Sequence, residues 1–83
     1  MKVSVKYFAS IREAIGVASQ QHDSQATTLG ELRDELIALG GSYAHSLARG
    51  RAVRMAQNQV MCDESATLTP DAEVAFFPPV TGG

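Results

Sequence analysis

The sequence predicts an α+β fold, in which one main helix packs across a mixed β-sheet and a short helix follows the first strand. Apolar residues alternate with polar ones near both ends of the chain, which is the period of strands with one buried face. Leucines recur at intervals of three and four in the middle, which is the period of a helix with one apolar face. A chain of 83 residues makes one domain, so this helix must bury its apolar face against the sheet.

Composition limits what such a domain does. The chain has 45% hydrophobic and 19% charged residues, as an ordinary soluble protein does. Folding at this length hides roughly 60–65% of the unfolded surface, which supports a modest core but no deep pocket. We therefore expect a protein that works by being bound, and not a self-contained small-molecule enzyme. A formal net charge of −2 disfavours a general nucleic-acid binder.

The lengths of the apolar runs and the number of cysteines indicate the compartment of the protein and its capacity to bind metal. No apolar run approaches the ~20 residues of a membrane helix, and Met1 and Lys2 lead directly into an alternating segment without a signal peptide. The single cysteine, Cys62, excludes an internal disulfide and a multi-thiolate metal site. We expect a cytoplasmic protein that binds no metal, no membrane and no nucleic acid.

The first half of the chain contains two strands and two helices. The first strand is predicted by three alternating apolar residues, Val3, Val5 and Tyr7. Ser10 and Glu13 match the capping box S-x-x-E, which predicts a short helix from Ser10 to a stop at Gly16. Residues 17–23 are polar and tolerate extended backbone, so we expect an edge strand there. The main helix begins after Thr28, with a second capping box, and buries four residues: Leu29, Leu32, Leu36 and Leu39.

The second half is predicted to add three strands. Gly40 and Gly41 end the main helix, and residues 42–50 are expected to be irregular with one helical turn at 44–47. Alternation at residues 53–56 and again at 60–62, broken by Asn58 and Gln59, predicts a hairpin. Residues 73–77 form the last strand. This order fits the ubiquitin-like β-grasp, with residues 1–77 as the domain and 78–83 as a tail.

The tail is the predicted working part of the chain. It would reach at most roughly 20 Å if extended. Pro78 and Pro79 stiffen its base, and Gly82 and Gly83 have no side chains, so they can thread a narrow channel in another protein. A frayed end is the plain alternative, since disorder concentrates at termini. The stiff diproline directly after an apolar strand favours a presented α-carboxylate on Gly83.

A carboxylate is a poor electrophile, so any chemistry at Gly83 needs activation by a partner. Attack of the carboxylate on ATP gives an acyl-adenylate, from which AMP leaves readily. A sulfur donor then makes a thiocarboxylate, whereas an amine makes an isopeptide. In both cases the chain is a carried substrate, and the partner supplies catalysis.

Two segments resemble the family of molybdopterin synthase small subunits. The run from Glu73 to Gly83, EVAFFPPVTGG, is similar to that family's C-terminus, and Val5 to Glu13, VKYFASIRE, is similar to its first strand and short helix. The likeness extends loosely over nearly the whole chain. The tail is the specific part, because a Gly-Gly end alone fits any ubiquitin-like carrier.

The resemblance implies a β-grasp sulfur carrier that binds no cofactor itself. An E1-like enzyme would use ATP to adenylate Gly83, and a sulfur donor such as a cysteine desulfurase or rhodanese would supply the thiocarboxylate. The tail would then insert into the large synthase subunit, where sulfur passes to cyclic pyranopterin monophosphate during molybdenum cofactor biosynthesis. The family's assembly is a heterotetramer, and the large subunit holds the catalytic groups. The resemblance therefore implies Gly82 and Gly83 as the reacting end.

One turn departs from the family's pattern. The family usually has Gly-Asp before the last strand, where this chain has Asp71 and Ala72. Asp tolerates the left-handed conformation better than most residues, so we expect the turn to survive.

The fold also predicts a docking face. In a β-grasp the first and last strands are neighbours, so Tyr7, Val74 and Phe76 would share the core face, and Phe8 and Phe77 would point the other way. Adjacent outward phenylalanines form an apolar patch of the kind found at interfaces. The predicted partner interface comprises Phe8, Phe77, Pro78, Pro79, Val80 and Thr81.

Several other residues are interpreted as structural. Cys62 is read as a small buried hydrophobe and not as the sulfur carrier. His22 and His45 are expected at the surface, and Met55 and Met61 in packing. The arginines at 49, 51 and 54 are interpreted as a solvated edge.

Three alternatives to the synthase subunit remain. A thiamine-pathway carrier would share the fold, although such tails lack Phe-Phe-Pro-Pro-Val-Thr before the glycines. A ubiquitin-type protein modifier would join Gly83 to lysines. A plain β-grasp interaction module would not need Gly83 at all.

Overall fold

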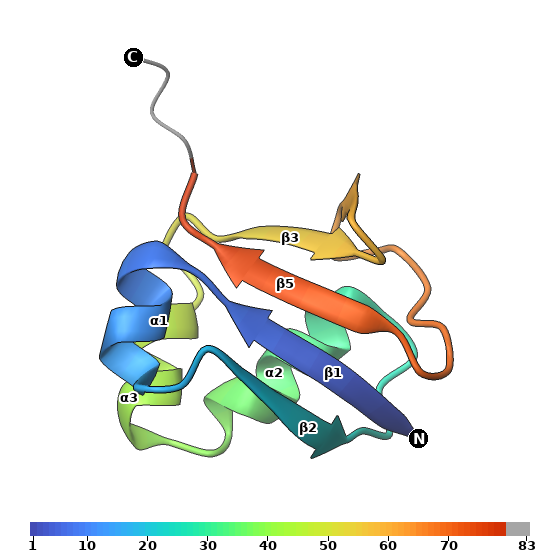
Figure 1. Ribbon diagram of the computed structural model, residues 1–83, viewed down its shortest axis with the longest axis horizontal. Coiled ribbons are helices and arrows are strands. Elements are labelled where there is room, and N and C mark those ends of the chain that lie inside the picture. The colour runs from blue at the N-terminus through green and yellow to red at the C-terminus, as the bar shows by residue number, and fades with distance from the viewer. Residues whose placement is uncertain (80–83) are drawn as a thin grey trace.

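The computed structural model describes residues 1–79, and residues 80–83 lie outside the description. The described residues form five strands and three helices (Figure 1), which in chain order are β1 (Lys2–Tyr7), α1 (Ala9–Ile15), β2 (Ser19–Asp23), α2 (Leu29–Ile37), α3 (Gly41–Leu47), β3 (Arg54–Gln57), β4 (Val60–Cys62) and β5 (Glu73–Phe77).

The strands form one mixed sheet in the order β2-β1-β5-β3-β4. The central pair, β1 and β5, is parallel, with Val5 opposite Val74 and Tyr7 opposite Phe76. The three other pairings are antiparallel. Figure 1 shows α2 behind the strands, with α1 and α3 together at one end of the sheet. The predicted mixed sheet, with its first and last strands side by side, is confirmed.

The core lies between the sheet and the helices. Its members are apolar residues from both layers: Val3, Val5, Tyr7, Ile11, Leu29, Leu32, Leu36, Leu47, Met55, Val74 and Phe76. Three of the four predicted helix leucines are fully buried, but Leu39 is 55% exposed. It fails to join the stripe because α2 ends at Ile37, with Ala38 as its C-cap.

The main helix begins as predicted. The Thr28 side chain accepts a hydrogen bond from the Glu31 N–H at 3.2 Å. The Glu31 carboxylate, however, accepts from the N–H and hydroxyl of Thr27, one residue before the position that a capping box uses. These bonds lower the pKa of Glu31. Gly30 packs closely against the segment around Glu64, since an added Cβ would lie 3.1 Å from the Cβ of Glu64 and would require that residue to shift.

The predicted start of the short helix is wrong. Ser10 is not its cap: α1 begins at Ala9, and Phe8 holds the N-cap position without a side-chain hydrogen bond. The Phe8 N–H still donates to the Phe76 carbonyl at 3.1 Å, so the chain passes from the sheet into the helix within one residue. The stop at Gly16 is confirmed, with a φ of 94° that favours glycine.

The segment after the main helix is more ordered than predicted. Residues 41–47 form the helix α3, where we expected one turn within an irregular stretch. Gly40, with a φ of 78°, reverses the chain between the two helices. The interaction that holds α3 is tertiary, since Leu47 is fully buried in the core.

The turns of the second half are as predicted. Asn58 and Gln59 both have positive φ, 51° and 70°, as two-residue hairpin turns require, and β3 pairs with β4 across them. The Asn58 side chain also accepts from the Glu73 N–H at 3.0 Å, which holds the start of β5. Asp71 has a φ of 59°, so the expected left-handed turn survives the departure from Gly-Asp.

Arg33 is the charged residue that sequence patterns did not identify as buried. It is only 4% exposed. Its Nε donates to the Leu47 carbonyl and its Nη2 to the Ala48 carbonyl, each at 2.8 Å, and Nη2 also reaches the Arg51 carbonyl at 3.3 Å. The guanidinium therefore holds the end of α3 and the following loop against α2.

Glu35 ties β2 to the same helix. Its carboxylate accepts from the Ser24 hydroxyl at 2.7 Å and the Gln25 N–H at 3.0 Å, and it lies 3.1 Å from His22 Nε2. Partial burial raises the pKa of Glu35, but these hydrogen bonds outweigh it and hold the pKa below its ordinary 4.5.

Replacing Arg33 with Met is expected to lower the free energy of unfolding by about 3 kcal/mol, because buried carbonyls lose their donors. Urea unfolding followed by circular dichroism measures the change. Arg12→Met, at an exposed arginine of α1, is the matched control and should stay within about 0.5 kcal/mol of the parent. Equal stabilities for the two variants would refute the role of Arg33.

Glu35→Gln is expected to lower the free energy of unfolding at neutral pH and to make that free energy less dependent on pH in the acidic range. The folded pKa of Glu35 is depressed, so its contribution is complete above the unfolded pKa and is lost as the pH falls below about 4.5. The stability gap between parent and variant should therefore narrow on acidification. Urea unfolding at a series of pH values measures this gap, and a gap independent of pH would contradict the assignment.

Candidate functional site

The predicted tail leaves the domain from the middle of the sheet. β5 lies between β1 and β3, and it ends at Phe77. Pro78 and Pro79 follow and are half-buried. The other predicted tail residues, Val80, Thr81, Gly82 and Gly83, lie outside the described residues. Their roles, and the division of the chain at residue 77, therefore stay predictions.

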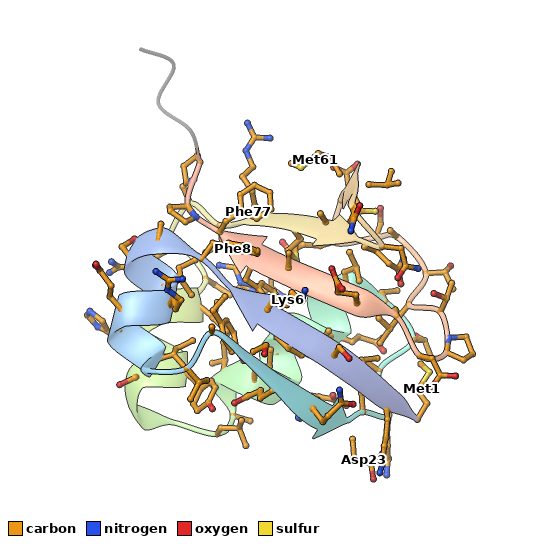
Figure 2. All side chains as sticks on the ribbon, in the orientation of Figure 1. Met1, Lys6, Phe8, Asp23, Met61 and Phe77 are labelled. Atoms are coloured by element: carbon orange, nitrogen blue, oxygen red, sulfur yellow. The ribbon has the colours of Figure 1, made fainter. Side chains whose placement is uncertain are left out.

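Two phenylalanines lie beside the base of the tail (Figure 2). The rings of Phe8 and Phe77 meet edge to face, with centroids 6.4 Å apart and planes at 87°. Phe8 is 45% exposed, whereas Tyr7 and Phe76, the preceding residue of each, are buried on the core side. The predicted parity of the four aromatic residues is confirmed, and the function of the exposed pair as an interface stays a prediction.

The phenylalanines form one wall of a shallow depression on the sheet face that the helices do not cover. We call it the open-face hollow; its volume is about 570 Å³, and it is lined by Lys6, Phe8, Ala56, Gln59, Met61, Glu73, Ala75 and Phe77. Ala75 pairs with Lys6 on one side and with Ala56 on the other. Two small side chains at the centre make a low floor between larger ones.

Met61 is the lining residue that the sequence analysis misplaced. It was expected in packing, but it is 55% exposed. The hairpin register explains the difference: Met61 lies opposite Ala56, and Cys62 lies opposite the core residue Met55. Counting outward from the two-residue turn at 58–59 would have placed Met61 on the open face.

The hollow is apolar at its centre and charged at its edge. Lys6 Nζ lies 3.3 Å from Glu73 Oε2 across β1 and β5. Both side chains are well exposed, so the pair contributes about 0–1 kcal/mol to stability. Exposed Phe8 and Met61 flanked by an ion pair resemble the apolar centre and polar rim of a protein interface.

The remaining candidates lie elsewhere. Cys62 is half-buried against the core and donates from Sγ to the Val60 carbonyl at 3.1 Å. His45 is exposed as expected, but His22 is half-buried beside Glu35. The arginines at 49, 51 and 54 are exposed as expected, although Arg49 pairs with Asp34 and Glu64.

Within residues 1–79 no three His, Cys, Asp or Glu side chains gather as a metal site would require. The same residues contain no helix long and apolar enough to cross a bilayer. The open-face hollow itself contains no Ser, Cys or His that could act as a nucleophile or base. Its arrangement of apolar and charged side chains is suited to binding another protein.

A mixed five-stranded sheet with parallel central strands, a helix across one face and a C-terminus leaving a central strand define a ubiquitin-like β-grasp protein. Comparison with known proteins then specifies the family. The profile of the ThiS family matches residues 5–83, and the chain belongs to that family.

Full-length relatives carry a more specific name. The molybdopterin synthase sulfur carrier subunit of Haemophilus influenzae is 38% identical over 98% of this chain and 99% of its own. The proteins of the same name from Escherichia coli and Mycobacterium tuberculosis are 36% and 34% identical, over 98% and 100% of this chain and 99% of each relative. The resemblance seen in the sequence is thereby confirmed.

Solved structures agree on the fold. A putative molybdopterin converting factor subunit 1 from Pyrococcus furiosus superposes with a TM-score of 0.78, at 24% identity over 96% of this chain and 99% of that one. The small archaeal modifier protein SAMP1 of Haloferax volcanii gives 0.77 at 22% identity, with both chains fully covered. One chain of a complex of subunits 1 and 2 of the molybdopterin-converting factor from Helicobacter pylori superposes with a TM-score of 0.69 at 26% identity, also with both chains fully covered.

Proposed function

We propose that this chain is the sulfur-carrier subunit of a molybdopterin synthase, which donates sulfur from a thiocarboxylate on Gly83 to cyclic pyranopterin monophosphate. The observation that supports this most is the 34–38% identity, over essentially the full length, to three proteins named as that subunit. The fold is consistent with it, because the last strand, β5, lies in the middle of the sheet and ends directly before Pro78.

The chemistry needs two activation steps. The Gly83 carboxylate attacks the α-phosphorus of ATP, pyrophosphate leaves, and an acyl-adenylate remains. The outer sulfur of a cysteine persulfide on the donor then forms a C–S bond to the carbonyl carbon while the C–O bond to AMP breaks, and AMP departs with the electron pair. Two thiols, which become a disulfide, then supply the two electrons that cleave the S–S bond, so that the thiocarboxylate stays on Gly83 and the donor's cysteine returns to a thiol. The proposed partners are an E1-like adenylating enzyme and a sulfur donor such as a cysteine desulfurase or rhodanese.

The large synthase subunit is the proposed site of sulfur transfer. The open-face hollow offers an apolar floor and a surface ion pair between Lys6 and Glu73, so the groups that bind pterin and move protons would come from the partner. A complex of the two subunits is the subject of the Helicobacter pylori structure, whose small chain this fold matches. The exposed Phe8 and the half-buried Phe77, beside the base of the tail, would dock on that subunit and guide the tail inward. We propose a cytoplasmic heterotetramer with two large subunits.

Incubation with ATP, a sulfur source and an activating enzyme should raise the intact mass of the chain by the difference between one sulfur and one oxygen atom. A variant lacking Gly83 should fold equally well, by circular dichroism, and should show no such gain. An unchanged mass in the presence of an activating enzyme that thiolates a known carrier would refute the proposal. Isopeptide conjugates on lysines would instead identify a protein modifier. Full cellular function without Gly83 would identify a plain interaction module.

Replacing Phe8 or Phe77 with Ala is expected to weaken binding to the large subunit by about 2 kcal/mol or more each, as central aromatic contacts do. Isothermal titration calorimetry measures the change. Leu39→Ala removes an equally exposed apolar side chain away from the open-face hollow, so it should leave the affinity unchanged. Equal affinities for all three variants would place the interface elsewhere.

A further inference from the structure

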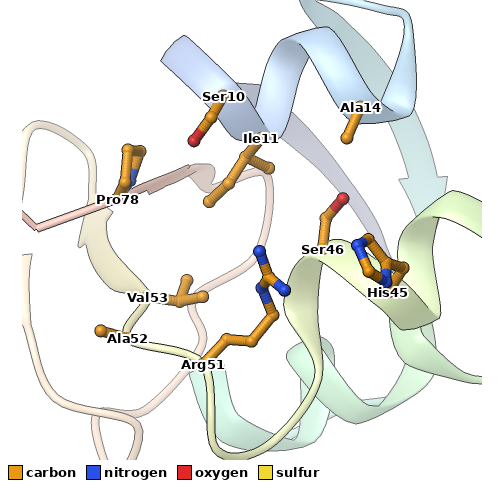
Figure 3. Close-up of a pocket in the computed structure, with 9 residues that line it drawn as sticks. All are labelled: Ser10, Ile11, Ala14, His45, Ser46, Arg51, Ala52, Val53 and Pro78. Atoms are coloured by element: carbon orange, nitrogen blue, oxygen red, sulfur yellow. The ribbon is translucent and has the colours of Figure 1, made fainter.

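A second hollow lies between α1 and α3, on the helical side of the tail's base (Figure 3). Its volume is about 330 Å³. The side chains of Ser46 and Arg51 point into the space beneath α1, the Ser10 hydroxyl points toward Pro78, and His45 lies beside Ser46. We call it the interhelical hollow. The proposed sulfur-carrier function does not use the interhelical hollow.

Ser46 supplies the first observation that a ligand is missing. The residue is only 5% exposed, and its Oγ is buried without a hydrogen-bond partner among the described residues. A buried hydroxyl without a partner costs about 1–3 kcal/mol. Such groups are rare in folded proteins, and a bound ion or water is one common explanation for them.

Arg51 supplies the second observation in favour of a ligand. Arg33 and Arg49 both have carboxylate neighbours, whereas no ion pair within residues 1–79 includes Arg51. Its backbone is nevertheless well held, since its N–H donates to the Ala48 carbonyl at 3.1 Å and its carbonyl accepts from Arg33. The planar guanidinium of an arginine can bind an oxyanion through two N–H donors at once, and it stays charged at every relevant pH.

The rest of the lining also favours a negative charge. It contains no Asp or Glu, and apart from the four polar residues it is apolar: Ile11, Ala14, Ala52, Val53 and Pro78. Apolar walls lower the local dielectric constant and so strengthen the attraction between Arg51 and an anion. They would also accept the organic part of a phosphate ester.

We propose that the interhelical hollow binds a small phosphate-class oxyanion, either inorganic phosphate or a phosphomonoester. The guanidinium of Arg51 offers a planar fork of N–H donors, and the hydroxyls of Ser46 and Ser10 approach from α3 and α1. Donors that line one hollow from three different segments suit a tetrahedral anion, whose oxygens point in several directions, better than a planar carboxylate. The site does not depend on the sulfur-carrier function.

Titration of the full chain with inorganic phosphate at constant ionic strength, followed by ¹H–¹⁵N NMR, tests the proposal. Saturable shifts are expected at Ser10, Ser46 and the Arg51 side chain. Sodium acetate titrated in the same way separates a phosphate site from a general cationic spot. Phosphate should bind at least about tenfold more tightly than acetate, because it accepts more of the charged hydrogen bonds.

Arg51→Gln is expected to weaken the binding of phosphate at least about tenfold, since it removes the charge that assists the hydrogen bonds. Arg54→Gln is the matched control: it removes an equally unpaired, exposed arginine from β3, outside the hollow, and should bind phosphate as the parent does. Ser46→Ala should weaken the binding of phosphate. In the absence of phosphate it should raise the midpoint of urea unfolding, because it removes a buried hydroxyl that has no partner among the described residues.

Saturable binding with this pattern of variants supports the site. Shifts that never saturate, equal responses to phosphate and acetate, or equal losses in Arg51→Gln and Arg54→Gln would each overturn it. Ser46→Ala keeps the test decisive if Arg51→Gln alters the loop. A Ser46→Ala variant that is less stable than the parent and binds phosphate normally would show that Ser46 only packs.

Discussion

The parallel pairing of β1 with β5 is the constraint on which the rest of the structure depends. It places Val5 beside Val74 and Tyr7 beside Phe76 on the core side, where the two rings lie 6.2 Å apart. The same register carries Phe8 and the residue after Phe76 to the opposite face. Because β5 lies in mid-sheet and ends at Phe77, Pro78 and Pro79 follow directly beside this aromatic pair.

Two different surfaces therefore meet at the base of the tail. On the sheet side, alanines form the floor of the open-face hollow, because larger residues there would fill it. On the helical side, Arg33 holds the loop after α3, and that loop positions Arg51 at the interhelical hollow. Pro78 lines the second hollow and follows Phe77, which lines the first. A protein partner on one side and a small anion on the other would both contact the root of the tail.

Sequence patterns predicted the fold well where a periodic signal coincided with a local stop signal. The strand at residues 3–7, the start of α2 at Thr28 and the hairpin turn at Asn58 are each determined by neighbours in sequence. The errors have a common cause. Ser10 lost its capping position because sheet pairing at Phe8 set the start of α1, and Leu39 lost its place in the core because α2 ended one turn early. Contacts between distant segments overrode the local preference.

By itself the sequence determined the class of fold, the aromatic parity of Phe8 and Phe77, and the family resemblance carried by the tail. These follow from side-chain alternation and short motifs, which need no knowledge of distant contacts. Only the tertiary structure decided that Arg33 is buried and that Ser46 and Arg51 line a hollow together with α1. The physical reason is that burial and convergence depend on which elements pack together, and no single segment of the chain encodes that.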